Sequence, residues 1–273
     1  MWGISSKAKA YQRRQQRRKA LCVQAGLEWP LRLVFVTGAG ISAASGIPTF
    51  RGPNGLWTQA ELQRFSHSSI LKTDLADFLA FHSARRQHIL ASEPTLAHRL
   101  IAALQAKAQV SVITQNIDDL HERGGSHQVL HMHGELFKAR CMASGRVMDW
   151  RTDLSPESQC NCCKPSSVMR PHIVWFGEMP LGMEHIYDAL EKAELFVSIG
   201  TSGNVYPAAG FVAEARRHGA VTLELNLEPS AQQGLFAAGS YGLATKIVPD
   251  WVDLMLQSDD WLHDLGGLVS GDY

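Results

Sequence analysis

Short apolar runs alternate with longer amphipathic segments along most of the chain. The apolar runs are rich in β-branched and aromatic residues and carry few charges, as expected of strands buried on both faces of a parallel sheet. We expect such strands at 33–36, 110–114, 129–134, 195–200 and 221–228. Apolar residues at helical spacing predict helices within 58–105, where one begins at Pro94 and Thr95, and others near 183–193 and 206–218. A closing strand and helix are expected within 246–256.

Strands that alternate with helices predict the α/β class, with a Rossmann-like parallel sheet covered by helices on both faces. We assign the sheet domain to 30–57, 106–134 and 172–256. The helical segment 58–105 and the segment 135–171, which lacks sheet-like or long helical periodicity, are expected to form a smaller lobe. The resulting domain, 30–256, would lie between a basic extension at 1–29 and a C-terminal tail at 257–273.

Composition excludes several functional classes. The chain has 273 residues and a net charge of zero, so no general affinity for nucleic acid is expected. It contains no uncharged apolar run long enough to span a membrane, which takes about 18 residues. Residues 1–29 are basic and lack the apolar core of a secretory signal. We interpret them as a solvated basic helix; a mitochondrial transit peptide, or weak affinity for nucleic acid or a membrane surface, are the alternatives.

A glycine-rich turn follows the first expected strand. Gly38, Gly40 and Ala43 match the G-x-G-x-x-G/A fingerprint of dinucleotide-binding folds, in which glycines permit a tight turn and bring backbone amides close to a pyrophosphate. Ser42 is expected to cap the next helical turn, whose N-terminus would favour an anion. The fingerprint alone is equally compatible with an ordinary strand–helix turn.

The chain after this turn departs from an ordinary dinucleotide fold. Gly46 and Pro48 interrupt the helix after about one turn, and Phe50 and Arg51 then lie in a loop. The planar guanidinium group of Arg51 suits a diphosphate or a ribose. An enzyme that only transfers hydride would not need this loop.

Polar residues stand where the other strands end. Ligands bind beyond the carboxyl ends of parallel strands, so 115–118, 200–202, Asn226 and Glu228 are expected to face a common site. His133 also ends a strand and is a candidate general base, although a lone histidine more often has a structural role. That structural role is assigned to His121, His131 and His172.

Four of the five cysteines lie in the segment 135–171. They are Cys141, Cys160, Cys162 and Cys163. Such a cluster in a chain of this size favours a metal over a disulfide framework. The reduced thiols that a metal site requires fit a cytoplasmic location, which we expect for this protein.

Taken together, these motifs resemble the sirtuins, the NAD-dependent protein lysine deacylases, and among them the bacterial CobB-type branch, near the class that removes acidic acyl groups. The similarity extends over about 30–256, with matching motifs at 38–42, 45–48, 50–52, 114–118, 133–134, 175–178, 200–202 and Asn226. The resemblance implies an NAD site made of Gly38, Ala39, Gly40, Ile41, Ser42, Phe50, Arg51, Trp57, Gln115, Asn116, Ile117, Asp118, Gly200, Thr201, Ser202, Asn226, Leu227, Glu228 and Ala244.

The resemblance also implies a reaction. The acyl-lysine oxygen attacks the ribose of NAD, nicotinamide leaves, and the products are free lysine and O-acyl-ADP-ribose. Asn116 and Asp118 would hold the nicotinamide carboxamide and the strained cofactor, Phe50 would shield the reactive face, and His133 would deprotonate a ribose hydroxyl. The acylated lysine side chains of other proteins would be the partners, and Val174, Phe176, Gly177 and Glu178 would pair with the substrate peptide as an added strand.

The first departure from the sirtuin pattern concerns the zinc motif. Sirtuins carry two Cys-x-x-Cys pairs around a structural zinc ion, whereas here Ser144 takes the place of one cysteine. Cys141, Cys160 and Cys163 fit as ligands, and either Cys162 or a water completes the four that zinc prefers; the alternative is a set of unmetallated thiols.

The second departure concerns the acyl group. Sirtuins that remove succinyl groups carry Tyr-x-x-Arg, and this chain reads His82-x-x-Arg85. Arg85 could bind a carboxylate, and the alternative is a solvated helix charge. Protonated His82 would add charge, so we expect desuccinylation to weaken as the pH rises above the His82 pKa.

Other activities remain open. A mono-ADP-ribosyltransferase would use the same NAD cleavage with a different nucleophile. A non-enzymatic NAD sensor or interaction module would not need Asn116, Asp118 and His133 together.

Overall fold

The structure, a computed structural model, describes residues 31–50, 64–67, 69–105 and 108–257, with the single positions 16, 20 and 55. Arg51 and Trp57, two of the predicted NAD ligands, lie outside the described residues.

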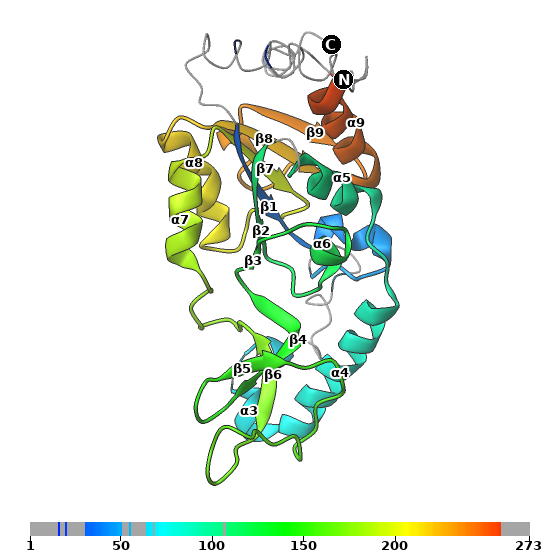
Figure 1. The fold of residues 1–273 in the computed structure, drawn as a ribbon, viewed down its shortest axis with the longest axis vertical. Helices are drawn as coiled ribbons and strands as arrows, with labels where there is room; N and C mark the ends of the chain where they lie inside the picture. Colours follow the sequence, from blue (N-terminus) through cyan, green and yellow to red (C-terminus); the bar gives the residue numbers. More distant parts are fainter. Residues whose placement is uncertain are drawn as a thin grey trace, which may run out of the picture.

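A six-stranded parallel sheet forms the upper part of the molecule in Figure 1. Its strand order is β3 (Val129–His131), β2 (Gln109–Thr114), β1 (Arg32–Thr37), β7 (Leu195–Ile199), β8 (Val221–Asn226) and β9 (Ala238–Tyr241). From β1 the chain adds β2 and β3 on one side and then returns to add β7, β8 and β9 on the other side. The strand order thus changes direction between β1 and β7, and such a switch point opens a crevice at the carboxyl edge. This confirms the predicted Rossmann-like class.

Helices cover both faces of this sheet. On one face, α5 (Leu96–Leu104) and α9 (Ala244–Gln257) pack against Phe35, Val197 and Leu225. On the other face, α7 (Met183–Glu191) and α8 (Phe211–Arg217) pack against Val34 and Phe196. Side chains alternate across a strand, so β1 supplies both cores. Its pattern is therefore continuously apolar from Leu33 to Val36 rather than alternating.

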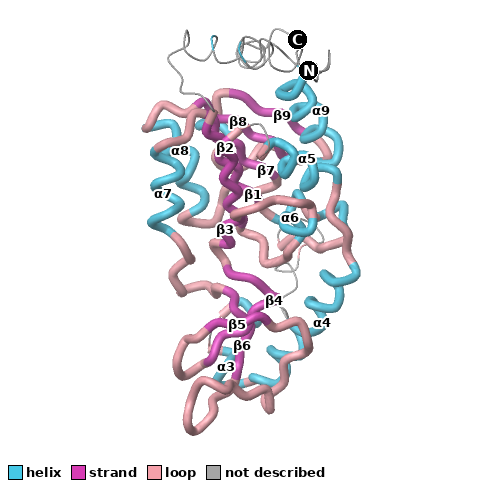
Figure 2. Tube along the Cα trace, viewed as in Figure 1, coloured by secondary structure: helices cyan, strands magenta, loops and turns pink. Residues whose placement is uncertain are grey.

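A three-stranded antiparallel sheet forms a second layer, at the bottom of Figure 2. Its order is β5 (Val147–Asp149), β4 (Gly134–Cys141) and β6 (Met169–Ile173), and it shares a hydrophobic core with α3 (Ile70–Thr73) and α4 (Leu75–Ala91). The short helix α6 (Leu120–Arg123) follows β2.

Three sequence expectations were wrong in detail. The segment 135–171 contains sheet. Its strands were not recognised because β4 and β6 are buried along most of their length and so lack a clear alternation of apolar and polar residues. The predicted closing strand within 246–256 is part of α9, which contains Pro249, and the last strand is β9. The strand at 221–228 ends at Asn226, so Glu228 lies in the loop beyond it. Among the described residues, none of the helices combines the length and the hydropathy that a bilayer crossing requires.

Candidate active site

A cleft of about 810 Å³ opens at the carboxyl edge of the parallel sheet. One wall consists of the loops after β1, β2, β7 and β8. The other wall comes from α4, from Phe65 and from the segment 173–178, which begins at the last residue of β6. The predicted residues that line it are Gly38, Ala39, Gly40, Phe50, His82, Arg85, Gln115, Asn116, Ile117, His133, Val174, Phe176, Gly177, Glu178, Gly200, Thr201, Ser202, Asn226, Leu227, Glu228 and Ala244.

The glycines of the first turn serve a purpose other than the one expected. The Gly38 and Gly40 amides donate to the carbonyls of Ile199 and Gly200, at 2.9 and 3.0 Å, so neither is free for a pyrophosphate. A Cβ on Gly38 would lie 2.7 Å from the Gly200 carbonyl oxygen, and a Cβ on Gly40 would lie 2.6 Å from the Gly200 Cα. The turn therefore needs glycine because the β1 and β7 loops touch through their backbones.

The expected helix break is present. The 3₁₀ turns Ala39–Ile41 and Ala43–Ser45 follow β1, and Gly46 ends the second with φ 84°, a left-handed conformation that favours glycine. Because these turns are so short, they give no helix N-terminus for anion binding. Ile41 is fully buried in the core behind the turn rather than in the cleft.

Ser42 does not cap the turn. Its buried hydroxyl donates to Oδ2 of Asp118 at 3.1 Å and accepts from Nδ2 of Asn116 at 3.1 Å. Nδ2 of Asn116 also lies 3.2 Å from the Gly38 carbonyl, which leaves Oδ1 of Asn116 as the acceptor for a ligand in the cleft. Ser42 therefore does not line the cleft but orients the side chains of Asn116 and Asp118 through hydrogen bonds.

Asp118 is a buried carboxyl group beside the cleft. Burial raises its pKa, and the hydrogen bonds from the Leu120 amide and the Ser42 hydroxyl oppose that rise. It lines the small cavity formed with Phe50, Arg85 and Asn116 rather than the main cleft.

His133 lies between β3 and β4 and lines the cleft. Its Nδ1 is 3.0 Å from the Gln115 carbonyl. A carbonyl only accepts hydrogen bonds, so Nδ1 carries the proton and Nε2 keeps its lone pair. Burial lowers the pKa of His133 below 6.5, so the ring is neutral at neutral pH. These are the properties of a general base.

The far end of the cleft is held by side chains that bond to its loops. Asn226 Nδ2 donates to the Thr201 carbonyl at 2.7 Å, and Oδ1 accepts from the Leu227 amide. The sequence did not indicate that Asn204, Val205, Tyr206, Ser230 and Leu243 also line this end. The signal in the sequence is only that each is close to a predicted site residue: Leu243 precedes Ala244, and the others follow Ser202 or Glu228 within four residues.

The segment 173–178 is more constrained than an open strand edge. The Val174, Phe176 and Glu178 amides already donate to the carbonyls of His133, Ser66 and Trp175. The Glu178 side chain accepts from Arg170 at 3.0 Å and from the Trp175 amide. A substrate strand would therefore have to bond mainly to carbonyl oxygens of this segment and to the Gly177 amide.

His82 and Arg85 both line the cleft from α4, as expected from the acyl-site motif. Neither ring nitrogen of the buried His82 has a hydrogen-bond partner among the described residues. Burial, and then the neighbouring Arg85 and Arg86, lower the pKa of His82 well below 6.5. The ring is neutral at neutral pH and above, so the predicted pH dependence of desuccinylation through His82 is not supported.

Arg85 keeps its charge in this setting. Its guanidinium carbon lies 5.1 Å from the Phe50 ring centre and 5.8 Å from that of Phe81. Burial lowers its pKa to about 10, which is still far above neutral.

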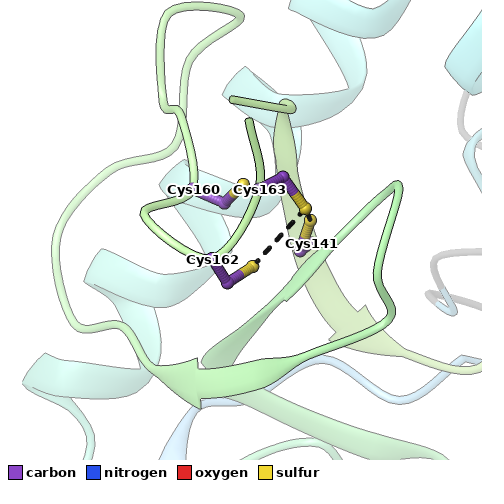
Figure 3. Close-up of side chains that lie close together, drawn as sticks. All are labelled: Cys141, Cys160, Cys162 and Cys163. Atoms are coloured by element: carbon purple, nitrogen blue, oxygen red, sulfur yellow. Dashed lines mark hydrogen bonds between the residues drawn. The ribbon is translucent and has the colours of Figure 1, made fainter. Parts of the chain in front are cut away.

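The sulfur atoms of the cysteine cluster point toward one another (Figure 3), and all lie within 4.8 Å. Cys163 Sγ is 3.7 Å from that of Cys141 and 3.8 Å from that of Cys162. Tetrahedral zinc with bonds of about 2.3 Å requires ligand sulfurs about 3.8 Å apart. The cluster fits that geometry with Cys162 as the fourth ligand, and the Ser144 and Ser167 amides donate to Cys141 and Cys160 as outer-shell groups.

Comparisons with known proteins agree with this geometry. The Sir2 family model matches residues 38–207. The NAD-dependent protein deacylase of Escherichia coli strain K12 is 50% identical over 230 residues, 83% of this chain and 82% of that protein. The protein of the same name from Yersinia pseudotuberculosis is 51% identical over 224 residues, 81% of each chain.

Solved structures give the same picture. A Sir2 homologue in complex with NAD has a TM-score of 0.77 and 29% identity, covering 90% of this chain and 95% of that one. A Sir2 structure with a deacetylated p53 peptide and 3′-O-acetyl ADP-ribose has a TM-score of 0.74 and 28% identity, covering 88% and 98%.

Proposed function

Since this chain belongs to the Sir2 family, we propose that it removes acyl groups from the lysine side chains of other proteins and consumes NAD in doing so. The observation that carries the proposal is His133. Its tautomer is held by the Gln115 carbonyl, it is neutral, and it lines a cleft with Asn116 and the loops after β1, β7 and β8. An NAD sensor would have no use for a base held in this way.

NAD supplies an electrophilic ribose carbon when its nicotinamide leaves. The chain's part is to hold that ring and to move a proton. Asn116 would present Oδ1 to the carboxamide because both hydrogens of Nδ2 are engaged by Gly38 and Ser42. Nε2 of His133 would take the proton from a ribose hydroxyl.

The remaining NAD residues would act at the other end of the cleft. Asn226 holds the Thr201 loop. Glu228 lines the cleft, and we assign it to a ribose diol of NAD. We assign Phe50 to the nicotinamide end, where it lies beside Asn116 and Asp118. Arg51 and Trp57 keep their assignment as predictions.

We propose acetyl-lysine and succinyl-lysine as substrates. Charged Arg85 in the cleft suits a terminal carboxylate, because a guanidinium group pairs with it through two hydrogen bonds.

A single zinc ion held by Cys141, Cys160, Cys162 and Cys163 would be structural, since all four ligand positions are taken by protein. A cytoplasmic location stays a prediction from the reduced cysteines.

The test is to incubate the protein with NAD and an acetyl-lysine peptide and to follow nicotinamide and free lysine. We expect nicotinamide release to require the acylated peptide, and His133→Tyr to abolish acyl removal with the fold unchanged by circular dichroism. Release without the peptide, together with ADP-ribose on a protein acceptor, would instead identify a transferase. NAD binding without any release would identify a sensor.

A further inference from the structure

Two histidines donate to consecutive carbonyl groups of the loop after β2. His131 Nδ1 lies 3.1 Å from the Asn116 carbonyl oxygen, and His133 Nδ1 lies 3.0 Å from that of Gln115. Residues two apart on a strand point to the same side, so β3 and its extension direct both rings at the loop after β2. Each carbonyl only accepts, so each Nδ1 carries a proton.

The two rings differ at Nε2. His133 presents it to the cleft, whereas Nε2 of His131 lies 2.7 Å from Oε1 of Glu122 on α6. The His131 side chain is only 5% exposed and that of Glu122 is 40% exposed, so the contact is shielded from water on the ring side. With a carboxylate on one side and a carbonyl on the other, both nitrogens of His131 must donate, and the ring is an imidazolium.

The charges around His131 favour this state. Burial alone would lower its pKa, but the hydrogen bond and the charge of Glu122 outweigh burial and raise it, with smaller help from Glu135 on β4. Asp118 also interacts with His131. The titratable rings of His121 and His133 also lie nearby; burial lowers the pKa of each, and both stay neutral.

We propose that His131, held as an imidazolium by Glu122, is a positioning residue that fixes the Asn116 peptide group. The Asn116 carbonyl is then anchored from one side by a charged donor, while its side chain is anchored from the other by Gly38 and Ser42. Together these bonds set the direction of Oδ1 of Asn116. This role rests on the proposed function, because it matters only if Asn116 binds nicotinamide.

The experiment combines nuclear magnetic resonance with kinetics. In the unmodified protein labelled with ¹⁵N-histidine, we expect both nitrogens of His131 to stay protonated to a pH well above that at which free histidine titrates. Glu122→Gln keeps the shape of the side chain and removes its charge. We expect it to lower the His131 pKa and to reduce kcat/KM for NAD about three- to tenfold, the effect of weakening one charged hydrogen bond. The KM for the acyl peptide should not change.

The kinetic loss should also depend on pH. The same nuclear magnetic resonance experiment gives the lower pH at which His131 of Glu122→Gln regains its second proton, and the difference from the unmodified enzyme should narrow as the pH falls through that point. Glu93→Gln is the matched control, because Glu93 is 77% exposed and pairs only with Arg123 among the described residues. It should have no effect.

The outcomes separate this role from the activity itself. A neutral His131 at neutral pH in the unmodified protein, or a Glu122→Gln variant with normal kinetics for NAD, would overturn the role of His131. A loss in Glu122→Gln that is the same at every pH would also overturn it, since that would indicate a merely structural effect. An unmodified enzyme that released no nicotinamide would overturn the proposed function, whatever the protonation of His131.

Discussion

The Ser42 hydroxyl donates a 3.1 Å hydrogen bond to the Asp118 carboxylate from a position with no exposed surface. The same oxygen accepts from Asn116, and His98 Nε2 lies 3.5 Å away. His98 is itself held by Thr95 at the start of α5, through bonds to its Nδ1. Ser42 thus links α5 to Asn116 and Asp118, which we assign to the nicotinamide end of the cleft.

Replacing Ser42 with alanine should raise the pKa of Asp118 further. Burial already raises that pKa, and the Ser42 hydrogen bond is one of the interactions that lower it. A larger fraction of Asp118 would then be protonated at a given pH, so the acid limb of kcat/KM for NAD should move to higher pH. The free energy of unfolding should fall by about 1–3 kcal/mol, because Asn116 loses a buried partner.

Ser45→Ala is the control for that experiment. Ser45 lies in the next 3₁₀ turn, and its hydroxyl donates to the Glu93 carbonyl at an exposed position. This variant should leave the pH profile unchanged. An acid limb that stays in place in Ser42→Ala would mean that Asp118 does not control the reaction in this pH range.

Removal of zinc should unfold the smaller sheet first. The cysteines join β4 to the loop before β6 and belong to the core that α3 and α4 share with this sheet. We expect freshly purified protein to contain one zinc ion per chain by mass spectrometry, and a chelator to lower its melting temperature. Zinc-free protein with an unchanged melting temperature would contradict the site.

The fourth ligand can be tested by moving a sulfur atom. Cys162→Ser should lose zinc or bind it more weakly. Ser144 Oγ lies 3.1 Å from Cys162 Sγ, so Ser144→Cys in the Cys162→Ser background should bring a sulfur back to the site and restore binding. If Cys162→Ser keeps full zinc affinity, a water rather than Cys162 completes the coordination.

Most strands of the larger sheet could be predicted because they are recognisable from their own residues. β1 and β7 are almost continuous apolar runs, and β2 is rich in valine and isoleucine. The polar residues that follow these strands had to meet at the carboxyl edge once the strands were parallel. β9 was missed since Ala238–Tyr241 contains glycine and serine and is only partly buried. Its place depends on pairing with β8, which no local pattern records.

The site could be predicted as a set of residues and not as a set of bonds. The motifs assembled Asn116 and His133 in one cleft, but local sequence gives no information on contacts between distant loops. The use of the Gly40 amide by Gly200, and of Ser42 by Asp118, depends on how β1, β2 and β7 are aligned. The sequence analysis treats His131 as a lone histidine with a structural role, because its partner Glu122 is on another element and no local pattern shows their contact.

The pH profile should also report His133. Burial lowers its pKa below 6.5, and a general base must be neutral, so activity should persist as the pH falls to 6.5 and decline only at lower pH. The measurement is kcat/KM for the acyl peptide at saturating NAD, over a range in which the unfolding transition shows the protein to be intact. A decline centred above 6.5 would mean that another group limits the reaction.

Acyl preference should depend on Arg85 and not on the charge of His82. Because His82 is neutral at pH 6.5 and above, the ratio of succinyl to acetyl turnover should stay constant as the pH rises from there. His82→Tyr should raise that ratio, since a phenol offers a donor to a carboxylate while the imidazole ring has no partner to fix its orientation among the described residues. A ratio of succinyl to acetyl turnover that falls steadily as the pH rises would instead indicate a charged His82.

Two substitutions of Arg85 give a graded test of the same site. Arg85→Met should reduce desuccinylation about tenfold or more, because a carboxylate loses charged hydrogen bonds worth about 1.5–3 kcal/mol each. Arg85→Lys should recover part of this loss, since lysine keeps the charge and lacks the planar fork. Deacetylation by the same variants is the internal control: an acetyl group has no carboxylate, so it should change little. Equal losses with both acyl groups would mean that Arg85 acts through its stacking on Phe50 and Phe81 rather than through the acyl carboxylate.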